Sequence, residues 1–565
     1  MRALVVIAAV LSLGASGRSS TIAVSASHIV TANPDSESVS ILDASTRAVV
    51  SELRLRATPQ TIAIDGARAF VALREGSVAV IDLATQRVER TAHIGVEPFG
   101  VATGDGRLYV SDAAAAVVHV VDAATLARIA TIPTKESPRG LALDAQRLYV
   151  THFRSGEISV IDTATLAVTK VITTGADSNL SEAVVLANGR AYAPQTRSNT
   201  TNQALLFDTT VFPIVSVLDL TTQENLPRER LAIDIVDRPS NMPTDAVLTS
   251  GNVMYVVLAG NDAVSVIDLA TKKTKVKQLT VGKNPRGIAL SADERFAFVN
   301  NALSGSVSVI DTATNAVVET TAVTTIPLPP DILNGKILFY TSADERLAKD
   351  RWISCATCHP DGGTDGRTWF FRDGPRNTPP LFATEQSMPM HWSGDLDELQ
   401  DVESTIRLIQ AGSGLASGAL RCMPACDRDA PHTGVSQDLD DLAAFMRTLR
   451  APRRTFETTD ASRRGAEVFA RANCASCHSG AFFSDGLKHD AGTGSSAQER
   501  KGSAFDTPTL RGLFDTAPYL HDGSAATLQQ AVAAHVSTLS AAELDDLAAY
   551  LKTIPFPQLK RRAVR

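Results

Sequence analysis

One short pattern recurs seven times in the N-terminal half of the chain. Each copy is an alternating apolar segment that ends in Asp, and the copies lie at 39–43, 78–82, 118–122, 158–162, 215–219, 264–268 and 307–311. Further apolar segments of strand type, such as 69–73 and 108–110, lie between them. A period of about 40 residues with several short strands per unit is typical of propeller blades. The sequence therefore predicts an all-β, seven-bladed propeller over residues 18–325.

The Asp that ends each copy suits a tight turn, because its carboxylate can accept hydrogen bonds from backbone N–H groups that follow it. The interval between the fourth and fifth copies is longer, because it contains a polar insertion at 179–208. We expect residues 21–30 to supply a strand that closes the ring. A tandem array of β-sandwiches is the alternative fold for this half.

Residues 1–17 have a different character. Arg2 precedes an apolar run at 3–13, and small residues follow at 14–17. This order is typical of a secretory signal peptide and predicts a periplasmic protein. The run is too short to cross a bilayer, so we do not expect a membrane-spanning protein. The net charge of −7 argues against a nucleic-acid partner, which would require basic stripes.

Four of the six cysteines lie in two Cys-x-x-Cys-His motifs, formed by Cys355, Cys358 and His359 and by Cys474, Cys477 and His478. The two thiols of such a motif add to the vinyl groups of a haem, and the following His binds the iron from one face. A redox Cys-x-x-Cys pair has no need of the His, and a zinc site would bring both pairs together. We therefore expect two covalently bound haem c groups, with His359 (haem 1) and His478 (haem 2) as proximal iron ligands.

Cys422 and Cys426 form the remaining pair, and no His directly follows either of them. In an oxidising compartment a disulfide is the expected state of such a pair. A metal site that includes His432 is the alternative, although two sulfurs and one imidazole leave zinc under-coordinated.

The surroundings of the two haem motifs are duplicated. The repeated pieces are a helical stretch with Gly335 or Gly465 near its start, a Thr-Pro turn at 378–379 or 507–508, a short segment ending in Gly at 391–394 or 520–523, and an amphipathic helix at 440–447 or 545–552. Helical spacing of apolar residues marks the last of these pieces. After a proline-containing linker at 326–334, we predict two mainly α-helical cytochrome-c-like domains, at 335–454 and 455–565.

Both halves resemble known families. The repeats resemble the YVTN family of bacterial β-propellers, with Tyr109-Val110 and Tyr149-Val150-Thr151 as matching pieces. Residues 331–557 resemble the bacterial di-haem cytochrome c peroxidase and MauG-like family, in the haem motifs, in the Thr-Pro turns at 377–381 and 506–510, and in the segment 517–524. In that family one haem is open to peroxide while the other relays electrons. The resemblance implies a peroxidase-like oxidoreductase that takes electrons from a small redox donor protein or a quinol-chain cytochrome.

The resemblance also implies different roles for the two haems. In the family, a Met fourteen residues after the His of the His-Asp-Gly motif is the sixth ligand of the C-terminal haem, and counting from His521 places His535 there. His535 would make haem 2 bis-histidine ligated, with a lower potential than Met ligation gives. The alternative is that His535 is a residue on a helix surface. Trp392 matches the tryptophan that lies between the haems and carries electrons.

Haem 1 is expected to be the site of peroxide chemistry. The His that caps the N-terminal haem in many peroxidases aligns with Trp369, and the distal Gln aligns with Val402, so this chain lacks both. Haem 1 is therefore either open or capped by Met390 or His391. Glu403, on a helix predicted over 396–409, is the candidate acid–base group that moves a proton between the peroxide oxygens.

Three further expectations concern ligands and partners. Arg511, after the second Thr-Pro turn, is a candidate partner for a haem propionate, because guanidinium pairs well with carboxylate. Calcium, which family members often bind between the haem domains, is unsupported because no carboxylate cluster stands out. The propeller is expected to dock or present a protein partner. A non-enzymatic electron-transfer cytochrome and a MauG-like oxidase of a partner protein are the alternative functions.

Overall fold

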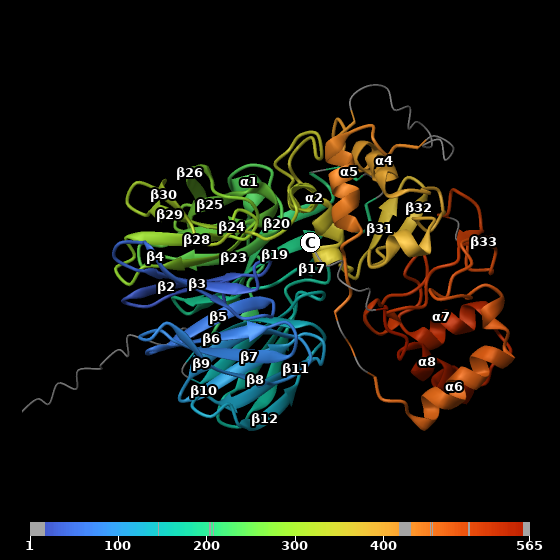
Figure 1. Ribbon diagram of the computed structural model, residues 1–565, viewed down its shortest axis with the longest axis horizontal. Coiled ribbons are helices and arrows are strands. Elements are labelled where there is room, and N and C mark those ends of the chain that lie inside the picture. Colours follow the sequence, from blue (N-terminus) through green and yellow to red (C-terminus); the bar gives the residue numbers. More distant parts are fainter. Residues whose placement is uncertain are drawn as a thin grey trace, which may run out of the picture.

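The computed structural model describes residues 17–557, apart from 145, 203, 204, 207, 417–430, 453, 455 and 495–497. Seven antiparallel sheets form a ring, and a helical C-terminal half lies beside it (Figure 1). The predicted propeller and the predicted helical cytochrome c region are thereby confirmed. Residues 1–16, which carry most of the predicted signal peptide, and the pair Cys422 and Cys426 lie outside the described residues.

Six of the seven blades are four-stranded meanders, in which each strand pairs with the next one along the chain. Their strands are β1–β4 (Ile22–Val24, His28–Asn33, Ser38–Asp43, Val49–Arg54), β5–β8 (Pro59–Asp65, Arg68–Leu73, Ser77–Asp82, Arg87–His93), β9–β12 (Pro98–Gly104, Arg107–Asp112, Val117–Asp122, Arg128–Pro133), β13–β16 (Pro138–Leu143, Arg147–His152, Ile158–Asp162, Ala167–Ile172), β23–β26 (Pro243–Leu248, Val253–Leu258, Ala263–Asp268, Lys273–Thr280) and β27–β30 (Pro285–Leu290, Phe296–Asn301, Ser306–Asp311, Ala316–Ala322).

The fifth blade is irregular because it contains the polar insertion. Its strands are β17 (Ser178–Asn179), β18 (Val185–Ala187), β19 (Arg190–Ser198), β20 (Val211–Asp219), β21 (Glu224–Asn225) and β22 (Leu231–Ala232). The short helix α1 (Ile233–Val236) follows it, and the 3₁₀ turn η1 (Ala259–Asn261) lies in the sixth blade.

The core of the propeller lies between neighbouring blades. The first strands of adjacent blades contact one another, for example β5 with β9, so these strands lie nearest the axis of the ring. Val71 and Ile81 of the second blade pack against Val30 and Ile41 of the first. Because each sheet is covered on both faces by its neighbours, its middle strands are apolar on both faces, as expected for buried strands.

The Asp at the end of each third strand caps the turn that follows it, as the repeat predicts. Its carboxylate accepts the N–H of the Thr three positions later, in the pairs Thr46 to Asp43, Thr85 to Asp82, Thr125 to Asp122, Thr165 to Asp162, Thr222 to Asp219, Thr271 to Asp268 and Thr314 to Asp311. Hydrogen bonds from Ser45 and Thr46 lower the pKa of Asp43 to about 2. The repeated Asp is therefore a turn residue.

The prediction that residues 21–30 supply a strand that closes the ring is wrong. β1 and β2 both belong to the first blade, and the last blade is completed by its own β30. The last blade already has four strands, so it leaves no place for a further one. Side-chain packing joins the first and last blades instead, with Ile22 and Ile29 against Phe298 and Val309.

The C-terminal half repeats one small set of elements. The first domain contains α2 (Pro330–Tyr340), α3 (Cys355–Cys358), η2 (Pro360–Gly362), β31 (Thr368–Phe371), β32 (Gly374–Asn377), η3 (Thr384–Ser387), η4 (Leu399–Asp401), α4 (Val402–Leu408) and α5 (Gln437–Met446). The second contains α6 (Asp460–Arg471), η5 (Cys474–Ser476), β33 (Lys488–His489), β34 (Phe505–Asp506), η6 (Leu513–Asp515), α7 (Leu528–His535) and α8 (Ala541–Leu551). Among the described residues, no helix has the length and apolar character needed to span a membrane.

Two helices differ from the expected boundaries. α2 begins at Pro330, inside the predicted linker 326–334, because the fixed φ of proline suits the first turn of a helix. The helix predicted over 396–409 is shorter, since Leu396 forms a backbone bridge with Met390 and helical structure starts only at Leu399.

Both domains use the same close helix crossing. α2 packs across α5, and α6 packs across α8. A Cβ at Gly335 would lie 1.9 Å from the Asp441 carbonyl oxygen, and one at Gly465 would lie 1.9 Å from the carbonyl oxygen of Asp546. Only glycine permits this approach of two helix backbones. The equivalent crossings support the duplication inferred from the sequence.

Candidate haem sites

The first haem motif lies on a short helix that is docked against the propeller. The side-chain amide of Asn241, on the propeller, donates to Thr357 Oγ1 at 2.9 Å and to Ser354 Oγ at 3.2 Å. Ala356 and Thr357, between the two motif cysteines, are buried. The propeller therefore holds the backbone to which haem 1 would be attached.

The second haem motif is more open to solvent. Ala475 and Ser476, which correspond to the buried Ala356 and Thr357, are exposed. The two motifs thus differ in accessibility although their sequences are nearly the same.

The donor sets at both motifs fit haem c. Within the described residues the four motif cysteines are free thiols, and burial raises the pKa of the Cys355 thiol to about 12. Burial lowers the pKa of His359 to about 4, so its imidazole is in the neutral form that binds iron. At the second motif, His478 Nδ1 donates to the Phe483 carbonyl at 3.1 Å, which leaves Nε2 for a metal.

His535 acts electrostatically on His478. Burial is the main cause that lowers the pKa of His478, and the charge of His535 lowers it further. His535 ends α7, and its Nδ1 donates to the Ala531 carbonyl at 2.8 Å, leaving Nε2 as the free ring nitrogen. A sixth iron ligand needs such an arrangement. The role of His535 at haem 2 stays a prediction, which this geometry supports.

The charge of His391 acts on the proximal residue His359. In addition to burial, the charge of His391 lowers the pKa of His359. His391 has a φ of 67°, and its Nδ1 bonds to Asp395 Oδ1 at 2.9 Å, which again leaves Nε2 free. Met390 is packed into the apolar core of the domain. Of the two residues considered as caps for haem 1, His391 has a ring nitrogen that can carry a proton, whereas the Met390 thioether can only act as an iron ligand.

Glu403 is buried and its carboxylate is already engaged. One oxygen accepts Arg407 Nε at 2.7 Å, and the other accepts the Leu415 N–H at 2.9 Å. These contacts tie α4 to the loop before residue 417. Its predicted role as the distal acid–base group is not tested by this arrangement, but no carboxylate oxygen is left without a partner.

Arg511 is similarly engaged within the second domain. Its Nε donates to the Ala481 carbonyl at 2.6 Å, and its Nη1 donates to the Pro555 carbonyl at 2.5 Å. The guanidinium therefore joins the loop after the second haem motif to the segment that follows α8. Its predicted contact with a propionate stays a prediction.

Trp392 lies where the two cytochrome domains meet. Its indole Nε1 donates to the Asn377 carbonyl at 2.9 Å, and its ring is 6.4 Å from the ring of His521. The backbone contacts are reciprocal: the Asn377 N–H donates to the His521 carbonyl at 2.6 Å, and the Asp506 N–H donates to the Trp392 carbonyl at 2.9 Å. Since these residues are equivalent in the duplicated halves, the two domains meet through an approximate twofold arrangement.

Asp361, two residues after His359, is inserted among cations of the propeller. Tyr340 Oη donates to it at 2.8 Å, and Arg139 Nη2 lies 3.9 Å from its second oxygen. Although burial acts in the opposite direction, Arg286, Arg139 and Arg74 hold the pKa of Asp361 well below its usual range. The segment that follows the proximal ligand of haem 1 is thus anchored electrostatically to the propeller.

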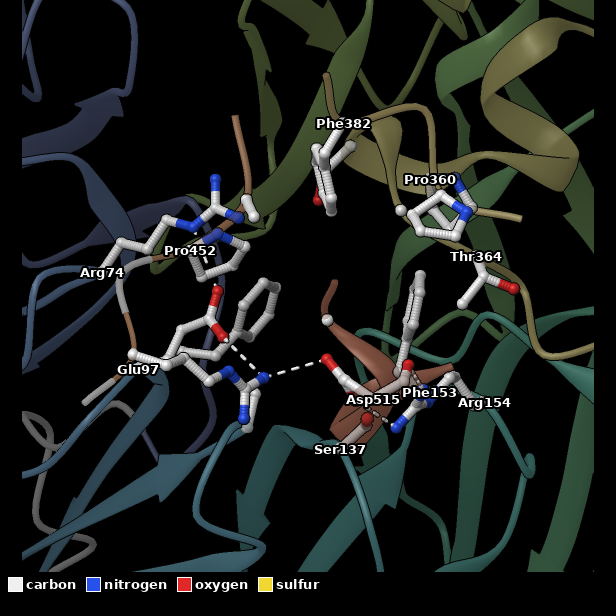
Figure 2. Close-up of a pocket in the computed structure, with 18 of the residues that line it drawn as sticks. Arg74, Glu97, Ser137, Phe153, Arg154, Pro360, Thr364, Phe382, Pro452 and Asp515 are labelled. Carbon is white, nitrogen blue, oxygen red and sulfur yellow. Dashed lines mark hydrogen bonds and ion pairs between the residues drawn. The ribbon is translucent and has the colours of Figure 1, made fainter. Parts of the chain in front are cut away.

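A cavity marks the place where the propeller meets both cytochrome domains (Figure 2). Its walls include Phe153 of the propeller, Thr364 of the first domain and Asp515 of the second. Arg154 and Arg454 both pair with Asp515, at 2.5 and 2.9 Å. Ion pairs therefore hold the three parts together around this cavity. The sequence alone did not indicate these residues, because Asp515 lies 361 positions from Arg154 and 61 positions from Arg454.

Comparisons with known families agree with this arrangement. The family described as di-haem cytochrome c peroxidase matches residues 331–410, and cytochrome c matches 462–555. The C-terminal half resembles the di-haem cytochrome c peroxidases and MauG. In the N-terminal half, the family described as cytochrome D1 heme domain matches residues 28–148 and 233–330.

Individual relatives support the same assignment. Methylamine utilization protein MauG from Methylorubrum extorquens is 28% identical over 40% of this chain and 79% of that protein. Cytochrome c551 peroxidase from Nitrosomonas europaea is 26% identical over 35% of this chain and 70% of that protein. Cytochrome c peroxidase Ccp from Escherichia coli is 27% identical over 40% of this chain and 59% of that protein. The chain is therefore a peroxidase-like oxidoreductase with covalently bound haem c.

Proposed function

We propose that this protein reduces hydrogen peroxide at haem 1, with electrons that enter at haem 2. The observation that carries the proposal is the contrast between the two motifs. The haem 2 motif is exposed at Ala475 and Ser476, whereas the haem 1 motif is buried against the propeller. A donor protein can approach the exposed motif, and a shielded site suits the reaction of a small molecule.

Between the two motifs, Trp392 offers an aromatic ring at the domain contact, next to His521. The bound haems would supply iron for peroxide and electrons for its reduction. The chain's own part in this step is to hold the two domains in a fixed relative position, through the reciprocal backbone hydrogen bonds around Trp392.

On the distal side of haem 1, His391 is the residue best placed to move a proton. Its free Nε2 would hold the proton that passes between the peroxide oxygens, which is the task of a distal acid–base group. Asp395 fixes the tautomer by accepting from Nδ1. Against the effect of burial, His391 and Lys501 hold the pKa of Asp395 well below its usual range, so this carboxylate stays ionised. Glu403 is the other candidate, and its two hydrogen-bonded oxygens make it the less available one.

At haem 2, His478 and His535 would hold the iron from both faces and exclude peroxide. The exposed surface around Ala475 would receive a small redox donor protein or a quinol-chain cytochrome. The N-terminal stretch at 1–17 supports a periplasmic location for this encounter.

The test is to mix the purified di-haem protein with hydrogen peroxide and a reduced cytochrome c, and to follow haem spectra and donor oxidation. The expected result is peroxide-dependent donor oxidation, with a spectral change at one haem. If peroxide and cyanide leave both haems unchanged, the protein is an electron-transfer cytochrome and the proposal is wrong.

Oxidation of a partner protein is the second candidate. It is favoured by Trp369, which stands where many peroxidases have the capping His, and by the relatives named MauG. It predicts slow peroxide turnover with small donors and a long-lived oxidised state that a partner protein discharges.

A further inference from the structure

The chain contains three tryptophans, and all of them lie in the first cytochrome domain. Trp392 is at the domain contact described above. Trp352 and Trp369 are both buried, in one cluster that also contains Val211 of the propeller. The motif cysteine Cys358 packs against this cluster. Two oxidisable rings therefore lie beside the attachment point of haem 1, on a side that the proposed electron path does not use.

Trp369 differs from Trp352 in its polar contact. Its Nε1–H donates to Asp365 Oδ2 at 2.9 Å, and both side chains are almost completely buried. The N–H of Asp365 donates in turn to the carbonyl of Cys358 at 3.0 Å. A continuous path of one covalent segment and two hydrogen bonds thus links the haem 1 motif to the indole ring of Trp369.

The surroundings of Asp365 suit a proton acceptor. Burial raises its pKa to about 7, although the Arg367 N–H, Trp369 and Thr378 donate hydrogen bonds that oppose the shift. A group with a pKa near the working pH accepts and returns a proton with little cost. An indole becomes a much stronger acid when it loses an electron, so a basic atom on Nε1–H makes that loss easier.

We propose that Trp369 is a redox-active residue that donates one electron to haem 1 while its Nε1 proton passes to Asp365. The proposal rests on the proposed function, since hydrogen peroxide is the oxidant. Peroxide takes up two electrons and two protons and forms two molecules of water. Trp369 supplies one electron, the reduced donor supplies the other by way of haem 2, and both protons come from solvent. Trp369 is left as a neutral radical and Asp365 as a carboxylic acid. An electron from the donor and the proton on Asp365 then restore the indole.

The first test uses freeze-quenched electron paramagnetic resonance (EPR) of the di-haem protein after one equivalent of peroxide. We expect a tryptophan radical that is lost in Trp369→Phe. Trp352→Phe is the matched control, because Trp352 lies in the same buried cluster but is not the donor to Asp365, and this variant is expected to keep the signal. A radical that survives in Trp369→Phe, or one that Trp352→Phe removes equally, overturns the proposal.

The second test changes only the proton acceptor. Asp365→Asn keeps an oxygen that can accept from Nε1–H but cannot take up the proton. We expect its radical to retain an exchangeable proton, visible as a coupling that disappears in deuterated water. The wild-type radical is expected to lack that coupling, and identical couplings in both proteins would contradict the role of Asp365.

A flash-quench experiment separates this inference from the proposed function. A photo-excited ruthenium complex and a sacrificial acceptor can oxidise the protein without peroxide. We expect a neutral tryptophan radical in wild type and none in Trp369→Phe. If peroxide does not react but flash-quench gives this radical, the peroxidase proposal fails and the redox-active Trp369 stands. If peroxide is turned over and neither method detects the radical, the assignment of Trp369 fails alone.

Discussion

The indole ring of Trp392 and the imidazole ring of His521 lie 6.4 Å apart, with their planes at 68°, where the two cytochrome domains meet. They occupy equivalent positions in the duplicated halves. The carbonyl of each accepts a backbone hydrogen bond from the Thr-Pro turn of the opposite half, at 2.6 and 2.9 Å. The contact therefore joins the two cytochrome domains and brings together an aromatic ring from each half.

Trp392→Phe is expected to slow electron transfer between the haems while leaving both of them attached. Phenylalanine fills most of the same space but is far harder to oxidise and lacks the bond to the Asn377 carbonyl. We expect kcat with peroxide and a reduced cytochrome to fall about tenfold or more, equivalent to about 1.4 kcal/mol of barrier. Stopped-flow spectroscopy measures the interhaem step directly. Trp352→Phe serves as the control, and an unchanged interhaem rate in Trp392→Phe would remove Trp392 from the path.

Substitutions of His391 and Glu403 distinguish the two candidates for the distal acid–base group. If His391 has this role, His391→Gln slows the reaction with peroxide by about 100-fold or more, the usual worth of acid–base catalysis. Glu403→Gln is then expected to leave that rate within a small factor of wild type. It should instead lower the free energy of unfolding by about 1–3 kcal/mol, because buried donors lose part of their partner. The kinetics of the reaction with peroxide and urea denaturation of both variants measure the two effects. If Glu403→Gln slows the reaction and His391→Gln does not, Glu403 is the acid–base group.

His535 is expected to be the sixth iron ligand of haem 2 and thereby to prevent other ligands from binding there. In His535→Ala the iron loses its sixth ligand, so a second haem should become high-spin and bind cyanide. In His535→Met the haem 2 potential should rise, because Met/His ligation favours the reduced iron. Resonance Raman spectra and a potentiometric titration check the two variants. Wild-type spectra in His535→Ala would show that this residue is only on the helix surface.

The propeller is expected to lose stability at acid pH through His152. This residue is buried, with Nε2 on Ser159 Oγ at 2.8 Å, and burial lowers its pKa from 6.5 to about 4. In the unfolded chain the imidazole gains a proton below pH 6.5, whereas in the folded protein it stays neutral down to about 4. Stability is therefore complete above pH 6.5 and falls as the pH drops towards 4, by about 3 kcal/mol at most. Urea denaturation at several pH values should show a smaller slope in His152→Gln than in wild type, and equal slopes would contradict this assignment.

The propeller and the haem motifs could be predicted because their signals are local. Strand alternation followed by Asp43 or Asp311, and Cys355 three positions before Cys358, can be recognised without knowing any distant contact. The anchoring of haem 1 could not be predicted in this way. Asn241 and Arg286 come from the sixth and seventh blades, and only the folded ring brings Asn241 to Thr357 and Arg286 to Asp361.

The residues expected on the distal side of haem 1 also depend on contacts that the sequence alone does not reveal. Glu403 was a reasonable candidate from its position on a helix, but its partner Leu415 comes from a loop whose path no helical pattern predicts. His391 could be proposed only as a cap, because its bond to Asp395 depends on the left-handed backbone at residue 391.

The central claim is that the two haems are unequal, with haem 1 reacting and haem 2 closed. The most direct measurement is EPR of the oxidised protein before and after addition of hydrogen peroxide, with wild type compared with His535→Ala. The account predicts that peroxide changes one haem signal in wild type, and that a low-spin bis-histidine signal, absent from His535→Ala, persists throughout. Two haem signals that both remain unchanged by peroxide, or that both react alike, would contradict it.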